Sequence, residues 1–176
     1  MRSFHFWRAL GALGAVLLLA GCVPSSEGVV QVACPPVSVL ADAVRVTKYR
    51  SPRGRDLTDV VVEAAVTGAR GECTFNRRDV TMTLAIGFDF AIGPANRDRM
   101  VAVSYFVAIV DPANNVVARE EIPIQLQVPV NQSRVTYAEE LEPRIPFRER
   151  SSLVGYRIYV GLVLTPDEAR ASRRRR

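Results

Sequence analysis

The fold is decided by residues 80–90, which read VTMTLAIGFDF. Large apolar side chains occupy every second position of this stretch, and small or polar residues stand between them. Such alternation is typical of a β-strand with one buried face, because successive side chains of a strand point to opposite sides of the sheet. The stretch therefore predicts a strand that contributes its apolar face to the core of an antiparallel sheet.

The same period of two recurs on both sides of this stretch. It is found in residues 44–47, 60–67, 101–109, 122–130, 135–137 and 156–164. Residues 100–110 are apolar on both faces, which predicts a central strand, whereas Pro123 and Pro129 predict an edge strand because proline lacks a backbone donor. Turn-forming residues separate the runs at 68–71, 93–98, 111–115 and 131–133.

These runs amount to roughly seven or eight short strands with no helical pattern between them. They predict an antiparallel, immunoglobulin-like β-sandwich, with a small antiparallel β-barrel as the alternative. Near the end of the chain, Thr165, Pro166 and Glu168 have the spacing of a capping box, which predicts a short C-terminal helix. With 176 residues and 48% hydrophobic residues, the chain can build one such core, and disorder of the whole chain is excluded.

The N-terminus has the pattern of an export signal. Arg2 and Arg8 precede an uncharged stretch over residues 9–20, which is shorter than the about 20 residues that a spanning helix needs. We therefore divide the chain into a signal peptide (1–21), a tether (22–33), a β-sandwich domain (34–165) and a short helix with an arginine-rich tail (166–176).

The end of this signal, Leu19-Ala20-Gly21-Cys22, resembles the lipobox of bacterial lipoproteins, and the whole chain resembles small, uncharacterised envelope lipoproteins of Gram-negative bacteria. The resemblance implies cleavage before Cys22, whose sulfur then carries a diacylglycerol and whose new amino group carries an acyl chain such as palmitate. Several acyl chains anchor a protein stably, whereas one does not. Because Val23 is not an aspartate, the sorting pattern of these lipoproteins implies the periplasmic face of the outer membrane. The alternative is an ordinary secretory signal.

Two further cysteines, Cys34 and Cys73, form an even pair in an exported chain, which favours a disulfide. Free thiols or a metal site are the alternatives, but two cysteines without a histidine do not complete the usual four-ligand zinc set. The sole histidine, His5, lies in the signal peptide. This inventory excludes hydrolases with a histidine base, and no glycine-rich phosphate loop is present. We expect no catalytic residue, no metal and no cofactor, and we expect the sole lysine, Lys48, to face outward from a strand.

The tail carries Arg173, Arg174, Arg175 and Arg176. It is either a contact for an anionic surface or a solvated terminus. Nucleic acid is not an expected partner, because export separates the chain from it. The sequence therefore predicts a lipid-anchored, non-enzymatic envelope protein that acts as an interaction or assembly module with an unknown protein partner. A small-molecule or lipid binder is the alternative, followed by a hydrolase of unrecognised type.

Overall fold

The computed structural model describes residues 33–50, 55–149 and 153–174. The signal peptide, Cys22 and most of the tether lie outside the described residues. In chain order the elements are β1 (Val37–Val39), η1 (Ala41–Ala43), β2 (Arg45–Tyr49), η2 (Leu57–Asp59), β3 (Val60–Phe75), β4 (Asp79–Ile92), β5 (Met100–Val110), β6 (Val116–Gln127), β7 (Arg134–Leu141), β8 (Arg144–Pro146), β9 (Arg157–Leu162) and α1 (Pro166–Arg173).

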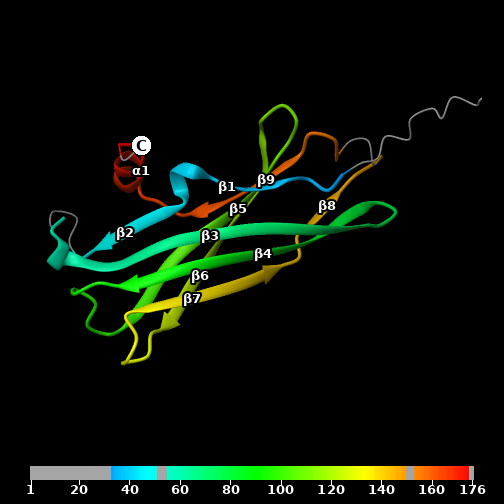
Figure 1. The fold of residues 1–176 in the computed structure, drawn as a ribbon. Coiled ribbons are helices and arrows are strands. Elements are labelled where there is room, and N and C mark those ends of the chain that lie inside the picture. The colour runs from blue at the N-terminus through cyan, green and yellow to red at the C-terminus, as the bar shows by residue number, and fades with distance from the viewer. Residues whose placement is uncertain (1–32, 51–54, 150–152, 175–176) are drawn as a thin grey trace, which may run out of the picture. The chain divides into compact units, whose positions relative to one another are not determined.

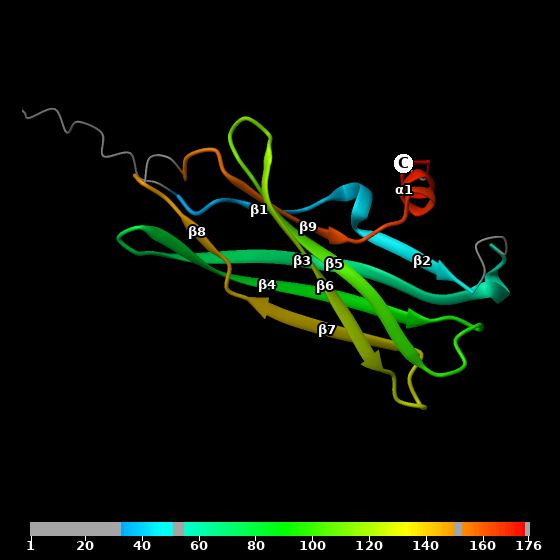
Figure 2. The same ribbon diagram turned by 180° about the vertical axis from the view of Figure 1, so that it is seen from behind.

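The strands form two sheets that lie one over the other (Figures 1 and 2). One sheet has the order β1-β9-β5-β6, and the other has the order β2-β3-β4-β7 with the short β8 also paired to β4. All pairs are antiparallel except β1 with β9. The predicted β-sandwich is confirmed, and the barrel alternative is wrong, because the described strands make two separate sheets. The described residues form nine strands, and the two that match none of the predicted runs, β1 and β8, are too short to show alternation in the sequence.

The core lies between the sheets and is built on the residues that alternate in β4. Its inward side chains are at most 1% exposed, and they are Val80, Met82, Leu84, Ile86, Phe88 and Phe90. Tyr105 of β5 and Ile158 of β9, both fully buried, face them from the other sheet. Burying each large apolar side chain contributes roughly 1.5–3 kcal/mol. The alternation in residues 80–90 therefore marks the centre of the fold.

The predicted turn at residues 68–71 is wrong, because β3 continues through it to Phe75. The ladder between β3 and β4 shifts register between Val66 and Gly68, which is a β-bulge. One extra residue there reverses which positions face the core. Even-numbered residues face inward before the bulge and odd-numbered residues after it, so Cys73 packs against the core. Glycine in a strand marked a bulge at this place and not a chain reversal.

The disulfide between Cys34 and Cys73 is confirmed, with the two Cα atoms 5.9 Å apart. Cys34 precedes β1 of one sheet, and Cys73 lies in β3 of the other sheet. The bond therefore joins the two layers at the end of the sandwich where the described chain begins.

Three further local predictions are confirmed. Strand β5 lies between β9 and β6 and is central, and β6 is an edge strand. Strand β6 begins at Val116, earlier than expected. The sequence did not reveal this first half because residues 116–121 are all exposed and show no apolar alternation. Pro129 lies beyond the end of the strand. Helix α1 begins with the predicted capping box: the Glu168 N–H donates to the Thr165 hydroxyl oxygen at 3.3 Å, and the Thr165 N–H donates to the Glu168 carboxylate at 2.8 Å.

Candidate functional site

Among the described strands, β7 pairs only with β4 and therefore presents a free edge of the five-stranded sheet. At its two ends, the Ile92 N–H donates to Ser133 at 2.9 Å and the Met82 N–H donates to Pro143 at 3.0 Å. Because hydrogen-bonded and free positions alternate along an antiparallel strand, the odd-numbered residues of β7 bond to β4 and the even-numbered residues turn their backbone groups away from it. We call these outward residues the β7 edge: Arg134, Thr136, Ala138 and Glu140. All four are exposed, and none is a proline.

Strand β6 also lies at a sheet edge, but this edge is interrupted. The Val163 N–H donates to the Ser104 carbonyl at 2.8 Å, so the backbone of Ser104 points to the β9 side, and its partner Pro123 points to the free side of β6. Pro123 has no N–H to offer an added strand there. Proline at an edge is a common protection against unwanted strand pairing, so β6 is the less suitable docking edge.

Both β7 and β6 carry a glutamate on the core side of their sheets. Glu139 of β7 stands opposite Ile86, and Glu120 of β6 stands opposite Val107. Inward-pointing charges can protect a sheet edge against aggregation, but both strands have one, so this feature does not distinguish β7 from β6 as a docking edge. Beside them, the Tyr105 hydroxyl is buried without a hydrogen-bond partner of good geometry. Burial raises the pKa of Tyr105 far above its usual range, and the nearby Glu139 carboxylate adds to the shift.

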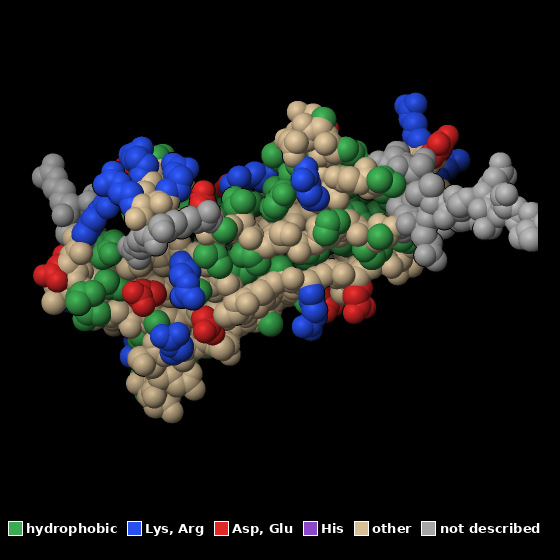
Figure 3. Space-filling model, turned by 45° about the horizontal axis from the view of Figure 1, so that its top comes forward, with side chains coloured by type: hydrophobic (Ala, Val, Ile, Leu, Met, Phe, Trp, Pro, Cys, Tyr) green, Lys and Arg blue, Asp and Glu red, His purple; other side chains and the backbone are tan. Residues whose placement is uncertain are grey.

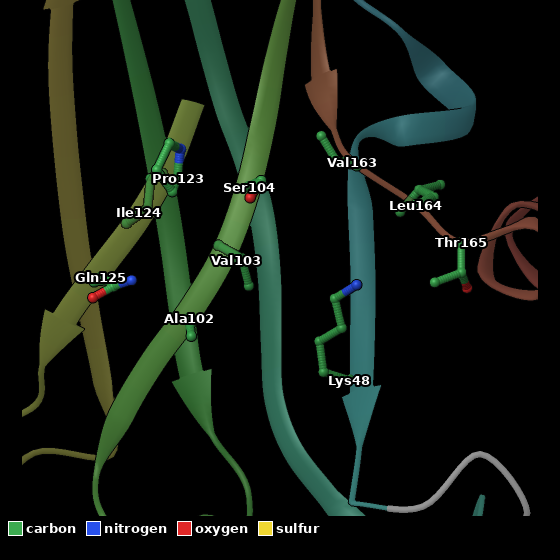
Figure 4. Close-up of a pocket in the computed structure, with 10 residues that line it drawn as sticks. All are labelled: Lys48, Ala102, Val103, Ser104, Pro123, Ile124, Gln125, Val163, Leu164 and Thr165. Carbon is green, nitrogen blue, oxygen red and sulfur yellow. The ribbon is translucent and has the colours of Figure 1, made fainter. Parts of the chain in front are cut away.

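An open groove of about 360 Å³ lies at the α1 end of the sandwich (Figure 4). Lys48 of β2 lines it together with residues 102–104 of β5, 123–125 of β6 and 163–165 after β9. It forms because β9 ends at Leu162 and the chain then turns away into α1, which leaves the first residues of β5 without a neighbour on that side. The groove brings the sole lysine of the chain and the Ser104 hydroxyl into one lining.

The expectation that Lys48 faces outward is wrong. Its strand partner Val62 is buried, and its side chain is 28% exposed. The Lys48 ammonium donates to the Glu168 carboxylate at 2.9 Å, a bond that ties β2 to α1. An ammonium group engaged by a carboxylate has no lone pair to offer a serine, so the ion pair argues against a serine–lysine catalytic dyad in this groove.

The other predicted positions lie at the ends of the chain. Arg173 and Arg174 end α1 and are exposed, and basic side chains gather at that end of the domain (Figure 3). Arg175, Arg176 and Cys22 lie outside the described residues. Lys48 pairs with Val62 and bonds to α1, whereas Cys34 is bonded to Cys73 at the other end of β3. Eleven residues of strand at about 3.3 Å each separate Val62 from Cys73 by roughly 36 Å, so α1 with its arginines and the disulfide lie at opposite ends of β3.

Sequence reasoning did not identify the β7 edge. The available signal was the segment RVTYAEEL, which has no proline and carries a positive charge at one end of a strand face and a negative charge at the other end. Among the described residues, no group of His, Cys, Asp and Glu side chains has the arrangement of a metal site. Nor does any helix in the described part of the chain have the length and hydrophobicity to cross a membrane. Comparisons with protein-family models, with curated proteins and with solved structures give no match to this chain.

Proposed function

We propose that the mature protein is a lipid-anchored, non-catalytic interaction module of the cell envelope that binds a protein partner by strand addition. The observation that carries this proposal is the β7 edge, where backbone donors and acceptors of successive outward residues are exposed and uninterrupted. An extended segment added to such an edge gains a ladder of main-chain hydrogen bonds. The outward side chains then select the partner.

The anchoring part of the proposal rests on the lipobox-like residues 19–22 and places the protein at the periplasmic face of the outer membrane. The 11 residues between Cys22 and Cys34 reach at most about 40 Å, and as a flexible coil about 18 Å. A domain on such a tether works close to its membrane. Arg173 and Arg174 lie at the opposite end of the domain from Cys34 (Figure 1), so in this proposal the arginine tail contacts the same anionic surface when the domain lies along the membrane.

A small-molecule or lipid binder has less support. The space between the sheets is filled with side chains such as Met82, Phe88 and Tyr105, each at most 1% exposed. The groove at the α1 end is open and not enclosed, whereas ligand sites usually bury most of the ligand surface. A hydrolase has less support still, because Lys48 is engaged by Glu168.

Site-specific photo-crosslinking in intact cells tests the proposal. A photoreactive residue at Thr136 on the β7 edge is expected to give a covalent adduct of defined mass, and the same residue at Gln125 on the interrupted β6 edge serves as the control. The additional change Ala138→Pro removes an outward N–H without touching a bond to β4, so the adduct should disappear. Absence of an adduct at Thr136, or an equal adduct at Gln125, contradicts the proposal.

A further inference from the structure

We propose that the partner of the β7 edge is a second copy of this chain, bound as a symmetric antiparallel β7–β7 pair. This inference rests on the proposed function, since it names the occupant of the same edge. A twofold contact uses the same surface on both copies. A strand suits such a contact only when its side chains complement those of an identical strand that runs in the opposite direction. The outward residues of β7 meet this condition in one register.

In that register the twofold axis passes beside Tyr137. Arg134 of one copy then faces Glu140 of the second copy, and the reverse pair forms at the other end of the strand. Between them, Thr136 faces Ala138 of the second copy, so two small side chains meet on either side of the twofold axis. Opposite charges that face each other across strands are stabilising, and like charges are destabilising.

The backbone of β7 supports the same register. All four outward residues carry an N–H, and each pair of directly opposed outward residues exchanges two hydrogen bonds, which gives about eight bonds in total. The two five-stranded sheets would then continue into each other. A shift of the axis to Thr136 would place Arg134 opposite Ala138 and remove the charge pairing.

The two charged residues are available for this contact. The Arg134 side chain is 66% exposed and lies 3.8 Å from the Asp89 carboxylate, a long and weak ion pair. Glu140 is exposed, and within the described ranges it forms no ion pair. By contrast, β6 has Pro123 at its free side, and the Arg119 guanidinium already bonds to Glu121 at 2.7 Å and lies over the Phe106 ring.

Charge exchange tests this pairing. We expect native mass spectrometry of the full-length protein, released from detergent micelles, to show a species with the mass of two chains. Arg134→Glu places two glutamates opposite each other at both ends of the contact, and Glu140→Arg does the same with arginines. Each single change should weaken self-association by roughly tenfold.

The two variants are complementary to each other. Mixing Arg134→Glu chains with Glu140→Arg chains should give a mixed dimer, and a chain that carries both changes should dimerise again. The control is Arg119→Glu with Glu121→Arg on the β6 edge, which should leave the dimer unchanged. Thermal unfolding of each variant shows whether it is folded.

The outcomes separate the two proposals. If the unchanged protein is monomeric at micromolar concentration, or if the mixture of variants does not associate, the second copy is not the partner. If Thr136 nevertheless crosslinks to a different envelope protein, the proposed function stands and this inference is wrong. If neither association nor crosslink occurs, both are wrong.

Discussion

Phe88 of β4 and Tyr105 of β5 meet between the two sheets, with ring centroids 4.9 Å apart and ring planes inclined by 54°. The contact joins the central strands of the two layers, and both side chains are at most 1% exposed. Tilted aromatic pairs of this kind contribute about 0.5–1.5 kcal/mol beyond the burial of their surface. The Tyr105 hydroxyl, however, is buried there without a good hydrogen bond.

Replacing Tyr105 by phenylalanine should therefore not weaken the fold. The ring contact with Phe88 is kept, and the variant removes a polar group that loses its water on folding without a full replacement. We expect the free energy of unfolding at pH 7 to be unchanged or raised by about 1 kcal/mol, measured by urea denaturation. Tyr105→Ala is the contrast, with an expected loss of about 3–5 kcal/mol. A loss of that size in Tyr105→Phe would show that the hydroxyl is satisfied.

The same residue predicts an alkaline limit of stability. Because the pKa of Tyr105 is raised in the folded state, the unfolded chain loses this proton first, at about pH 10. This proton therefore does not change the free energy of unfolding with pH below about pH 10, and the free energy of unfolding decreases as the pH rises further. Unfolding followed between pH 9 and 11 should show this decrease in the parent protein and a shallower decrease in Tyr105→Phe. Identical pH profiles would contradict the assignment.

The disulfide should contribute strongly to stability. A bond that closes a loop with a sequence separation of 39 contributes up to about 4 kcal/mol by the chain-entropy model. For a domain of this size, Cys34→Ser should lower the melting temperature by on the order of 10 °C. Calorimetry with and without a thiol reductant provides the control, since reduction of the parent should give the same shift. An unchanged melting temperature in the variant would rule out this contribution.

Two glycines of the sheets form a matched pair of substitutions. A Cβ at Gly161 would lie 2.7 Å from the Ala43 Cβ and 3.0 Å from the Phe106 ring, whereas a Cβ at Gly68 meets nothing within 4 Å. Gly161→Ala should destabilise the protein by about 1–3 kcal/mol, and Gly68→Ala should change its stability by less than about 0.5 kcal/mol. Equal effects in chemical denaturation would show that the packing of Ala43 and Phe106 on β9 is not tight.

The lipid anchor is tested at Cys22. Cys22→Ala should leave a precursor that retains residues 1–21 and takes up no labelled palmitate, as measured by intact mass and metabolic labelling. Cys34→Ala should still be cleaved and acylated, which separates anchoring from the disulfide. Normal processing of Cys22→Ala would mean that residues 19–22 are not a lipobox.

The sequence by itself determined the fold class, because alternation along a strand reports directly which face is buried. Residues 80–90 are the clearest example, and Pro123 marked an edge strand for an equally local reason. The Thr165 capping box predicted α1 in the same way, since its hydrogen bonds join residues three positions apart. The pairing of Cys34 with Cys73 followed from counting cysteines in an exported chain.

Tertiary structure alone decided the features that depend on pairing between distant segments. The residues at 68–71 have the composition of a turn, but β3 continues through them in pairing with β4, and a bulge takes up the one extra residue in the ladder. The alternation in β2 does not reveal the partner of Lys48. Lys48 bonds to Glu168 because β9 ends at Leu162 and the capped helix α1 then lies beside β2. The exposed face of Arg134 and Glu140 is likewise set by the register of β7 on β4. Hydrogen bonds between strands fix such positions, and no local pattern contains them.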